Sequence, residues 1–235
     1  MKRSQTNAAI ARCIANAAAF HVPLPRWADW KPSQFDASAD GMRHQKLGWK
    51  VIDFGLGTFE SCGLVVLVLT SPLVDKTGEP LKANSQVGDY EYPVTSFSRK
   101  LLFVQAGQTE PHHFHRQKAR KEVTILGGAP VTFELAWADG DEKLSKRDVN
   151  VQVDGIWHKL KADGEITINP GETITLPGEL SHIIKVAAGG KDTIMMETCT
   201  ANNDSNDNIF PFMTPTGNPI EEDEEARYQH LDEHK

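Results

Sequence analysis

Residues 149–160 read VNVQVDGIWHKL, two five-residue runs of strand-forming residues joined by Asp154 and Gly155. An Asp-Gly pair between such runs is typical of a two-residue β-hairpin turn. Similar runs of β-branched and aliphatic residues occupy 51–54, 63–69, 101–104, 131–135, 166–168, 173–176, 183–186 and 194–196. Short strands separated by Gly and Pro turns, with no helical runs between them, predict an all-β fold, either an antiparallel barrel or a jelly roll. Rossmann and TIM-barrel folds are excluded because they need alternating helices.

The two ends of the chain predict a helix and extended arms. Residues 1 to about 20 are Ala-rich, with Ser4 as a candidate N-cap and an apolar stripe of Ile10, Ile14 and Ala17. The Trp- and Pro-rich stretch 21–45 is expected to wrap the barrel, and a sugar-stacking platform is the alternative. We therefore divide the chain into a helix and arm over 1–45, a barrel over 46–200 and a C-terminal extension over 201–235. Residues 71–96 predict a long loop with short strands, and the acidic run 221–225 predicts a helix start or a surface loop.

The composition is that of an ordinary globular protein. Of 235 residues, 24% are charged and 39% hydrophobic, and the net charge of −7 argues against nucleic acid or an anionic membrane as a partner. No apolar stretch reaches the roughly 18 residues that a membrane helix needs. Three widely spaced cysteines, Cys13, Cys62 and Cys199, do not form the pattern of a disulfide framework, so a reducing cytoplasm is the expected location.

A histidine-rich segment indicates a metal site. His113 and His115 are two residues apart, so on a strand their imidazoles project to the same face. Glu122 and His182, supplied by later strands, would complete a shell of three nitrogens and one oxygen. That shell suits a divalent ion such as manganese, iron, cobalt, nickel or zinc, with positions left for substrate. The alternative is a chance surface cluster of neighbouring histidines.

Two blocks around these residues resemble the two-part signature of the cupin barrels. The first block, over 107–128, has the order Gly, His-x-His, Glu, Gly, and the second, over 170–182, has the order Pro-Gly followed by His. A stretch of expected hairpins separates them. The resemblance implies a cupin (jelly-roll) β-barrel, here with an N-terminal helix and extended terminal arms.

A closer resemblance is to the D-lyxose ketol-isomerases. The matching blocks are LGW (47–49), DFGLG (53–57), KLLFV (100–104), GQ (107–108), HFH (113–115), PGE (170–172), NNDSNDN (202–208) and IEEDE (220–224). They follow one another in order from about residue 4 to residue 228. The resemblance implies a manganese-dependent aldose–ketose isomerase, usually a homodimer, that interconverts D-lyxose with D-xylulose and often D-mannose with D-fructose. Its ligands would be Mn2+ and a free monosaccharide.

Carried over residue by residue, the resemblance implies an active-site lysine at Lys118 and four metal ligands, His113, His115, Glu122 and His182. The chain departs from the family pattern here, because Arg120 stands where the ligand carboxylate is expected. A bulge of one or two residues would be needed to bring Glu122 to the metal. Glu134 is the fallback ligand.

A second departure follows the Asn/Asp-rich block. The family tends to carry an acidic residue after an Arg-Phe pair, whereas residues 208–213 read NIFPFM. This difference weakens the transfer of lyxose specificity.

Aldose–ketose isomerisation moves a proton between neighbouring carbons, so it needs a Lewis acid to stabilise the enediolate and a base near the C–H bond. Glu197 is the candidate base, and a strand glutamate paired with a Lys or Arg that lines the barrel is the alternative. Lys118 would stabilise the developing oxyanion or shuttle a proton, unless it is a surface lysine. Asp204 and Asp207 are expected either to bind sugar hydroxyls or to cap a turn.

Two other functions use the same fold. One is a metal-dependent oxygenase or epimerase, since two histidines and a carboxylate also suit iron(II). The other is a non-catalytic carbohydrate-binding protein that kept the pocket and lost the base. Exchange of the C2 proton of a sugar separates an isomerase from a binding protein.

Overall fold

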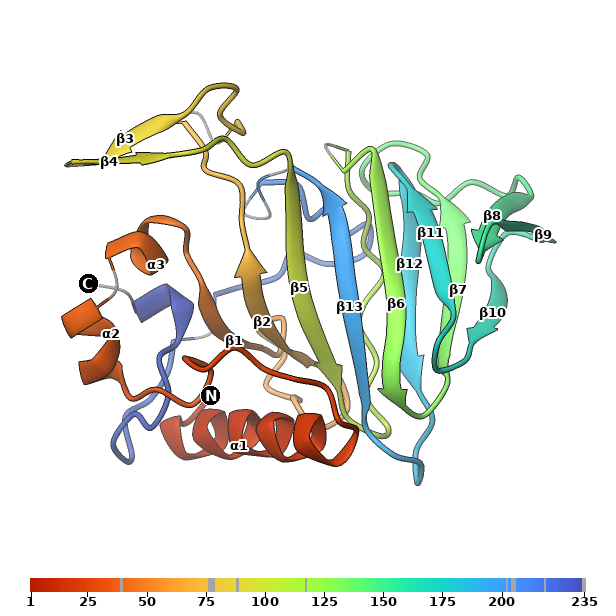
Figure 1. The fold of residues 1–235 in the computed structure, drawn as a ribbon. Helices are drawn as coiled ribbons and strands as arrows, with labels where there is room; N and C mark the ends of the chain where they lie inside the picture. Colours follow the sequence, from red (N-terminus) through yellow and green to blue (C-terminus); the bar gives the residue numbers. More distant parts are fainter. Residues whose placement is uncertain are drawn as a thin grey trace.

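The computed structural model describes residues 1–38, 40–75, 79–87, 89–116, 118–201, 203, 206–217 and 219–233. Most of the described strands belong to two antiparallel sheets (Figure 1). The larger sheet has the order β1 (Gly48–Ile52), β2 (Leu64–Thr70), β5 (Phe97–Val104), β13 (Thr193–Thr200), β6 (Arg120–Gly128), β11 (Thr173–Pro177), β8 (Val149–Val153) and β9 (Ile156–Leu160). The smaller sheet has the order β10 (Gly164–Ile168), β7 (Val131–Trp137) and β12 (Leu180–Val186). A separate hairpin joins β3 (Ser85–Val87) to β4 (Tyr90–Tyr92).

The all-β class is therefore confirmed, and so is the hairpin over 149–160. Val153 of β8 pairs with Ile156 of β9, which leaves Asp154 and Gly155 as the two turn residues. Their φ angles are +50° and +80°, which is the left-handed conformation that this type of turn requires at both positions. The predicted barrel takes the form of two sheets packed face to face, and within the described residues they are not joined into one closed ring of strands.

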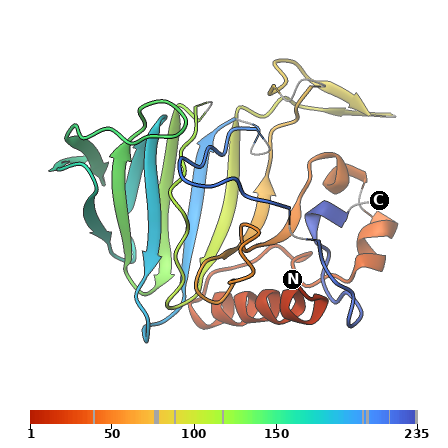
Figure 2. The same cartoon turned by 180° about the vertical axis from the view of Figure 1, so that it is seen from behind.

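One hydrophobic core fills the space between the two sheets. Val123 and Ile125 of β6 and Phe133 and Leu135 of β7 are fully buried in it, because alternate side chains of each strand point toward the other sheet. The smaller sheet covers only part of the larger one. Behind the sheet of Figure 1, the chain that follows β13 crosses the face near β1, β2 and β5, as Figure 2 shows from the other side. Residues of β2 and β5 line a cavity on that side.

A second core lies between the outer face of the larger sheet and the helix α1 (Arg3–Ala19), which Figure 1 shows lying across the end of the sheet. Ile10 and Ala17 are buried there, as the predicted stripe requires, and Ile14 is half-buried. Val65 and Leu67 of β2 meet this helix, while Val66 and Val68 face the cavity side. Strand β2 is apolar from Leu64 to Leu69 because both of its faces are covered.

The cap of α1 differs from the prediction. Lys2 is the N-cap residue and Ser4 lies inside the helix. The carboxylate of Asp223 accepts hydrogen bonds from the Ser4 backbone N–H at 2.8 Å and from the Ser4 hydroxyl at 2.7 Å. Part of the acidic run 221–225 therefore satisfies the helix N-terminus, where negative charge is favourable.

The remaining elements are short. Helices α2 (Pro32–Ser38) and α3 (Asp40–His44) lie in the Trp- and Pro-rich arm, and the 3-10 helix η1 (Leu231–Glu233) contacts β1. Trp27 of the arm packs against both cores, as expected for a segment that covers hydrophobic surface. Among the described residues, no helix has the length and apolar character needed to cross a membrane.

Candidate active site

The segment 113–115 is held between two other parts of the chain. His113 exchanges backbone hydrogen bonds of 3.3 and 3.0 Å with His182 of β12, and Phe114 exchanges two of 3.0 Å with Ile209. In this extended conformation Phe114 is buried on one side while His113 and His115 point to the other. One ring nitrogen from each of His113, His115 and His182 lies within 4.8 Å of the other two. The structure thus brings together the three predicted histidines.

Each of these histidines is oriented by a backbone carbonyl. Nδ1 lies 3.1 Å from the Pro111 oxygen in His113, 2.8 Å from the Asp207 oxygen in His115, and 3.0 Å from the Leu180 oxygen in His182. A carbonyl only accepts, so Nδ1 carries the proton and Nε2 carries the lone pair. This is the arrangement found in metal-binding histidines, whose second nitrogen is fixed by an outer hydrogen bond.

Burial keeps the three rings neutral. It lowers the pKa of His113 to about 3, with the positive charge of Lys121 as the next cause. Burial also lowers the pKa of His115 and His182 well below its usual value, and nearby lysine charges act in the same direction. The Nε2 atom of His115 is buried and has no hydrogen-bond partner among the described residues. Three neutral imidazoles with converging Nε2 atoms fit a divalent cation.

The structure does not bring Glu122 to this cluster. Its carboxylate pairs with the Arg120 guanidinium at 2.5 Å on the exposed outer face of β6. Because side chains alternate along a strand, the neighbouring Lys121 points inward instead. The expectation of Glu122 as the carboxylate ligand is therefore corrected, and the described strand contains no bulge at this point of its pairing with β11.

The fallback carboxylate, Glu134 of β7, also lies elsewhere. It accepts a hydrogen bond of 2.5 Å from Lys185 and lies 3.4 Å from Nε2 of His112. These contacts make it part of a surface network beside the smaller sheet rather than a ligand of the three-histidine cluster.

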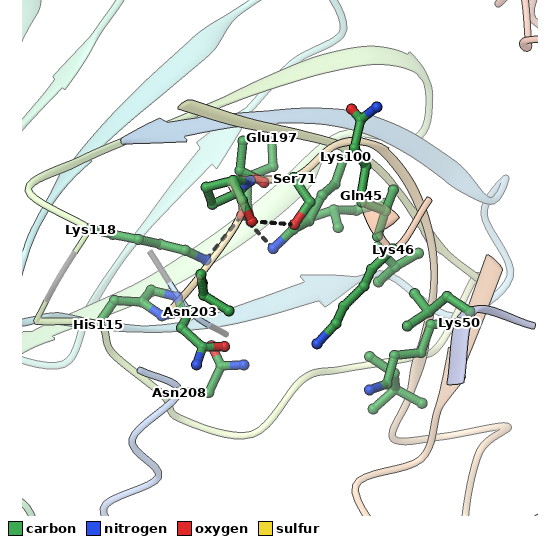
Figure 3. A pocket seen from close by; sticks show the side chains of 18 of the residues that line it. Gln45, Lys46, Lys50, Ser71, Lys100, His115, Lys118, Glu197, Asn203 and Asn208 are labelled. Atoms are coloured by element: carbon green, nitrogen blue, oxygen red, sulfur yellow. Dashed lines mark hydrogen bonds and ion pairs between the residues drawn. The ribbon is translucent and has the colours of Figure 1, made fainter. Parts of the chain in front are cut away.

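Glu197 lies at the centre of a buried cluster of lysines. Its Oε1 is 3.1 Å from Nζ of Lys118 and 3.7 Å from Nζ of Lys100, and its Oε2 is 2.9 Å from Nζ of Lys121. Figure 3 shows Lys118 and Lys100 reaching Glu197 from opposite sides. Burial by itself would raise the pKa of Glu197, but the three ammonium groups outweigh burial and hold that pKa well below its usual value. Glu197 is therefore a carboxylate at neutral pH.

The structure also shows whether Lys118 is a surface lysine and whether Asp207 caps a turn. The Lys118 side chain is 3% exposed, so it is not a surface lysine. Asp207 caps a turn, because its carboxylate accepts from the backbone N–H of Arg116 at 2.7 Å and of Lys118 at 3.3 Å. Asp204 lies outside the described residues.

Sequence reasoning missed three buried charged residues, Lys100, Lys121 and Glu110. Lys100 follows the strand period of its apolar neighbour Leu102, and both line the cavity. Glu110 is 4% exposed, its Oε1 has no hydrogen-bond partner among the described residues, and burial raises its pKa to about 7. Its position between the Gly107 turn and Pro111 gives no sign of burial in the sequence.

A cavity of about 520 Å³ connects these groups, which is within the usual size range of small-molecule sites. His113, His115 and Glu197 line it, and Asn203 and Asn208 from the Asn/Asp-rich block add amide groups (Figure 3). Neutral imidazoles, carboxyl groups, lysines and amides can hold a cation, move a proton and bind several hydroxyl groups.

Comparisons with known proteins identify the family of this chain. The family model for D-lyxose isomerase matches residues 1–234. The chain is 31% identical over 231 residues to a D-lyxose/D-mannose isomerase of Escherichia coli O157:H7, across 97% of this chain and 95% of that protein. It is 29% identical over 232 residues to a D-lyxose/D-mannose isomerase of Serratia proteamaculans, with the same coverage of 97% and 95%.

Solved structures support the fold. The L-ribose isomerase of Cellulomonas parahominis with L-ribose has a TM-score of 0.52 and 12% identity, across 92% of this chain and 94% of that one. The L-ribose isomerase of Acinetobacter sp. DL28 in complex with L-ribose gives the same values. The match of the family model to nearly the whole chain, with a relative above 30% identity, confirms the resemblance seen in the sequence: the chain belongs to the D-lyxose isomerase family.

Proposed function

We propose that this protein is an aldose–ketose isomerase that converts D-lyxose to D-xylulose and, as a second reaction, D-mannose to D-fructose. The observation that carries the proposal is a cluster of three carbonyl-anchored histidines, two of which line the cavity together with a buried carboxylate and its lysines. Membership of the D-lyxose isomerase family and the names of the two bacterial relatives support the choice of sugars.

We assign His113, His115 and His182 as the residues that would hold a divalent cation, most simply Mn2+. The family resemblance supports manganese, and the converging Nε2 lone pairs support a cation of this type. When bound, the ion supplies Lewis-acid polarisation of the carbonyl and hydroxyl oxygens of the open-chain sugar. The three rings themselves stay neutral and fixed, because burial disfavours their protonation and a backbone carbonyl holds each Nδ1.

We assign Glu197 as the base that takes the C2 proton of the aldose and then, as the carboxylic acid, delivers a proton to C1. Its charged state at neutral pH leaves it able to accept a proton. Lys118, 3.1 Å away, would fix the orientation of this carboxylate and donate a hydrogen bond to the oxygen on which negative charge develops. Asn203 and Asn208 line the same cavity, so their amides are candidates for binding the remaining hydroxyls.

The experiment compares Glu197, which lines the cavity, with Glu122, which lies on the outer face of β6. With Mn2+ present, Glu197→Gln should lower the rate of D-xylulose formation from D-lyxose by roughly a hundredfold or more, because a buried proton acceptor is lost. Glu122→Gln is the matched control and should leave the rate unchanged, since Glu122 pairs with Arg120 on the outer face. Loss of activity in Glu122→Gln with activity kept in Glu197→Gln would reverse both assignments.

We also propose that the protein is a cytoplasmic homodimer. The family resemblance supports the dimer, and the three cysteines, which form no disulfide among the described residues, support a reducing compartment. Sedimentation velocity at micromolar concentration should give a single species of twice the 26.0 kDa chain mass. A single species of the chain mass would contradict the dimer.

A further inference from the structure

Lys121 reaches directly into the three-histidine cluster. Its Nζ lies 3.1 Å from Nε2 of His182 and 2.9 Å from Oε2 of Glu197, and its side chain is 4% exposed. His113, His115 and Lys121 are among the residues that line the cavity, whereas the 1% exposed His182 is not among the described lining residues. The lysine therefore contacts both the cavity that a ligand would enter and the ring nitrogen of His182.

The contact with His182 uses the atom that a metal would need. Nδ1 of His182 donates its proton to the Leu180 oxygen, so Nε2 has a lone pair and no proton. The Lys121 ammonium has only protons to give, so it donates one of them to this lone pair. A single lone pair cannot bind the ammonium and a metal ion at the same time.

The positive charge of Lys121 also opposes metal binding. A divalent ion bound to the three Nε2 atoms would lie within a few ångströms of a buried ammonium, where the surrounding low dielectric strengthens the repulsion. The ammonium is itself held in place, because its other contact is the buried carboxylate of Glu197. Displacing Lys121 thus breaks one ion pair and one hydrogen bond.

We propose that Lys121 competes with the metal ion for His182 and thereby sets the metal affinity of this protein. The inference rests on the proposed three-histidine centre and adds a residue that acts through one of its ligands. Lys121 is a positioning residue. In the metal-free protein its ammonium donates a hydrogen bond to Nε2 of His182, and metal binding requires this hydrogen bond to break. The wild-type protein should accordingly bind Mn2+ more weakly than a variant without this ammonium.

The test is the Mn2+ dissociation constant, measured by equilibrium dialysis with elemental analysis and repeated by electron paramagnetic resonance titration. Lys121→Met keeps the length and apolar stem of the side chain and should tighten Mn2+ binding by about tenfold or more, or roughly 1.4 kcal/mol. Lys121→Glu should tighten it further, because a carboxylate could then join the three nitrogens. Circular dichroism checks the fold of both, and if Lys121→Glu fails to fold, Lys121→Met decides.

Lys100→Met is the matched control. Lys100 is another buried lysine of the same cavity, but it pairs with the other carboxylate oxygen of Glu197, Oε1, at 3.7 Å. Its removal deletes the same charge and leaves the Lys121 contact with His182, so the gain in affinity should be smaller. If Lys121→Met and Lys100→Met raise the Mn2+ affinity equally, or if Lys121→Met does not raise it, Lys121 does not compete with the metal for His182. The proposed three-histidine metal site would be unaffected by either result. No Mn2+ binding by any of the four proteins would overturn both.

Discussion

Asp207 connects the Asn/Asp-rich block to the histidine segment, and Asp207→Ala should lower both the stability and the activity of the protein. One carboxylate oxygen accepts from the backbone N–H of Arg116 at 2.7 Å, and the other accepts from that of Lys118 at 3.3 Å. The backbone oxygen of Asp207 also accepts from Nδ1 of His115 at 2.8 Å. The residue is 2% exposed, so water does not readily replace these bonds.

The magnitude of the Asp207→Ala change follows from these contacts. A hydrogen bond to a charged group contributes about 1.5–3 kcal/mol, and the longer bond to Lys118 belongs at the low end of that range. Losing both bonds should lower the free energy of unfolding by about 3 kcal/mol. For a chain of this size each 1 kcal/mol shifts Tm by roughly 2–4 °C, so we expect Tm to fall by about 6–12 °C.

The assay is thermal unfolding followed by circular dichroism, with Asp207→Asn as the matched variant. Asparagine keeps one acceptor oxygen and the shape of the side chain, so its effect should be about half as large. D-lyxose turnover should fall in Asp207→Ala beyond what unfolded protein explains, because the backbone that orients His115 loses its anchor. A Tm for Asp207→Ala within 1 °C of the wild type would refute the reasoning.

Two further predictions concern pH. His113 has a pKa of about 3 in the folded protein against 6.5 when unfolded, so the unfolded state binds the proton first and stability is lost as pH falls below 6.5. His113 alone should remove about 2 kcal/mol between pH 7 and pH 5, which denaturant melts at the two pH values would measure, and an unchanged midpoint would contradict it. Glu110 acts in the opposite direction, because its pKa of about 7 exceeds the reference value of 4.5, so its burial becomes more unfavourable as pH rises from 4.5 to above 7. The stability of Glu110→Gln relative to the wild type should therefore be greater at pH 8 than at pH 5, by about 2.5 kcal/mol, and a difference that does not change with pH would exclude the raised pKa.

Local patterns predicted the parts of the structure that depend on neighbours in sequence. The hairpin at Asp154 and Gly155 follows from turn chemistry, and the shared direction of His113 and His115 follows from the strand period. The same period could have corrected the carboxylate ligand. Val123 and Ile125 are the buried apolar residues of β6, so the inward set contains position 121 and excludes position 122. This alternation directs Glu122 to the outer face, where it pairs with Arg120, whereas the family resemblance implied Glu122 as a ligand only with a bulge that the pairing of β6 with β11 does not contain.

Other features depend on residues far apart in the chain, and no local pattern contains them. Asp207 caps a turn about ninety residues earlier, and Asp223 binds the first turn of α1 from the opposite end of the sequence. The burial of Glu110 likewise arises from packing against distant strands, which its loop-like surroundings in sequence do not indicate. The boundaries at residues 45 and 200 and the roles of Lys118 and Glu197 stay predictions.

The most direct test of the central claim is exchange of the C2 proton of D-lyxose and D-mannose in deuterated buffer, followed by proton NMR with Mn2+ added. We predict that the wild-type protein exchanges this proton on at least one of the two sugars. We also predict that His115→Ala does not, because it removes the imidazole whose Nε2 has no hydrogen-bond partner among the described residues. Full retention of the C2 proton by both sugars with folded, Mn2+-supplied wild-type protein would contradict the assignment of this cavity as a D-lyxose isomerase site.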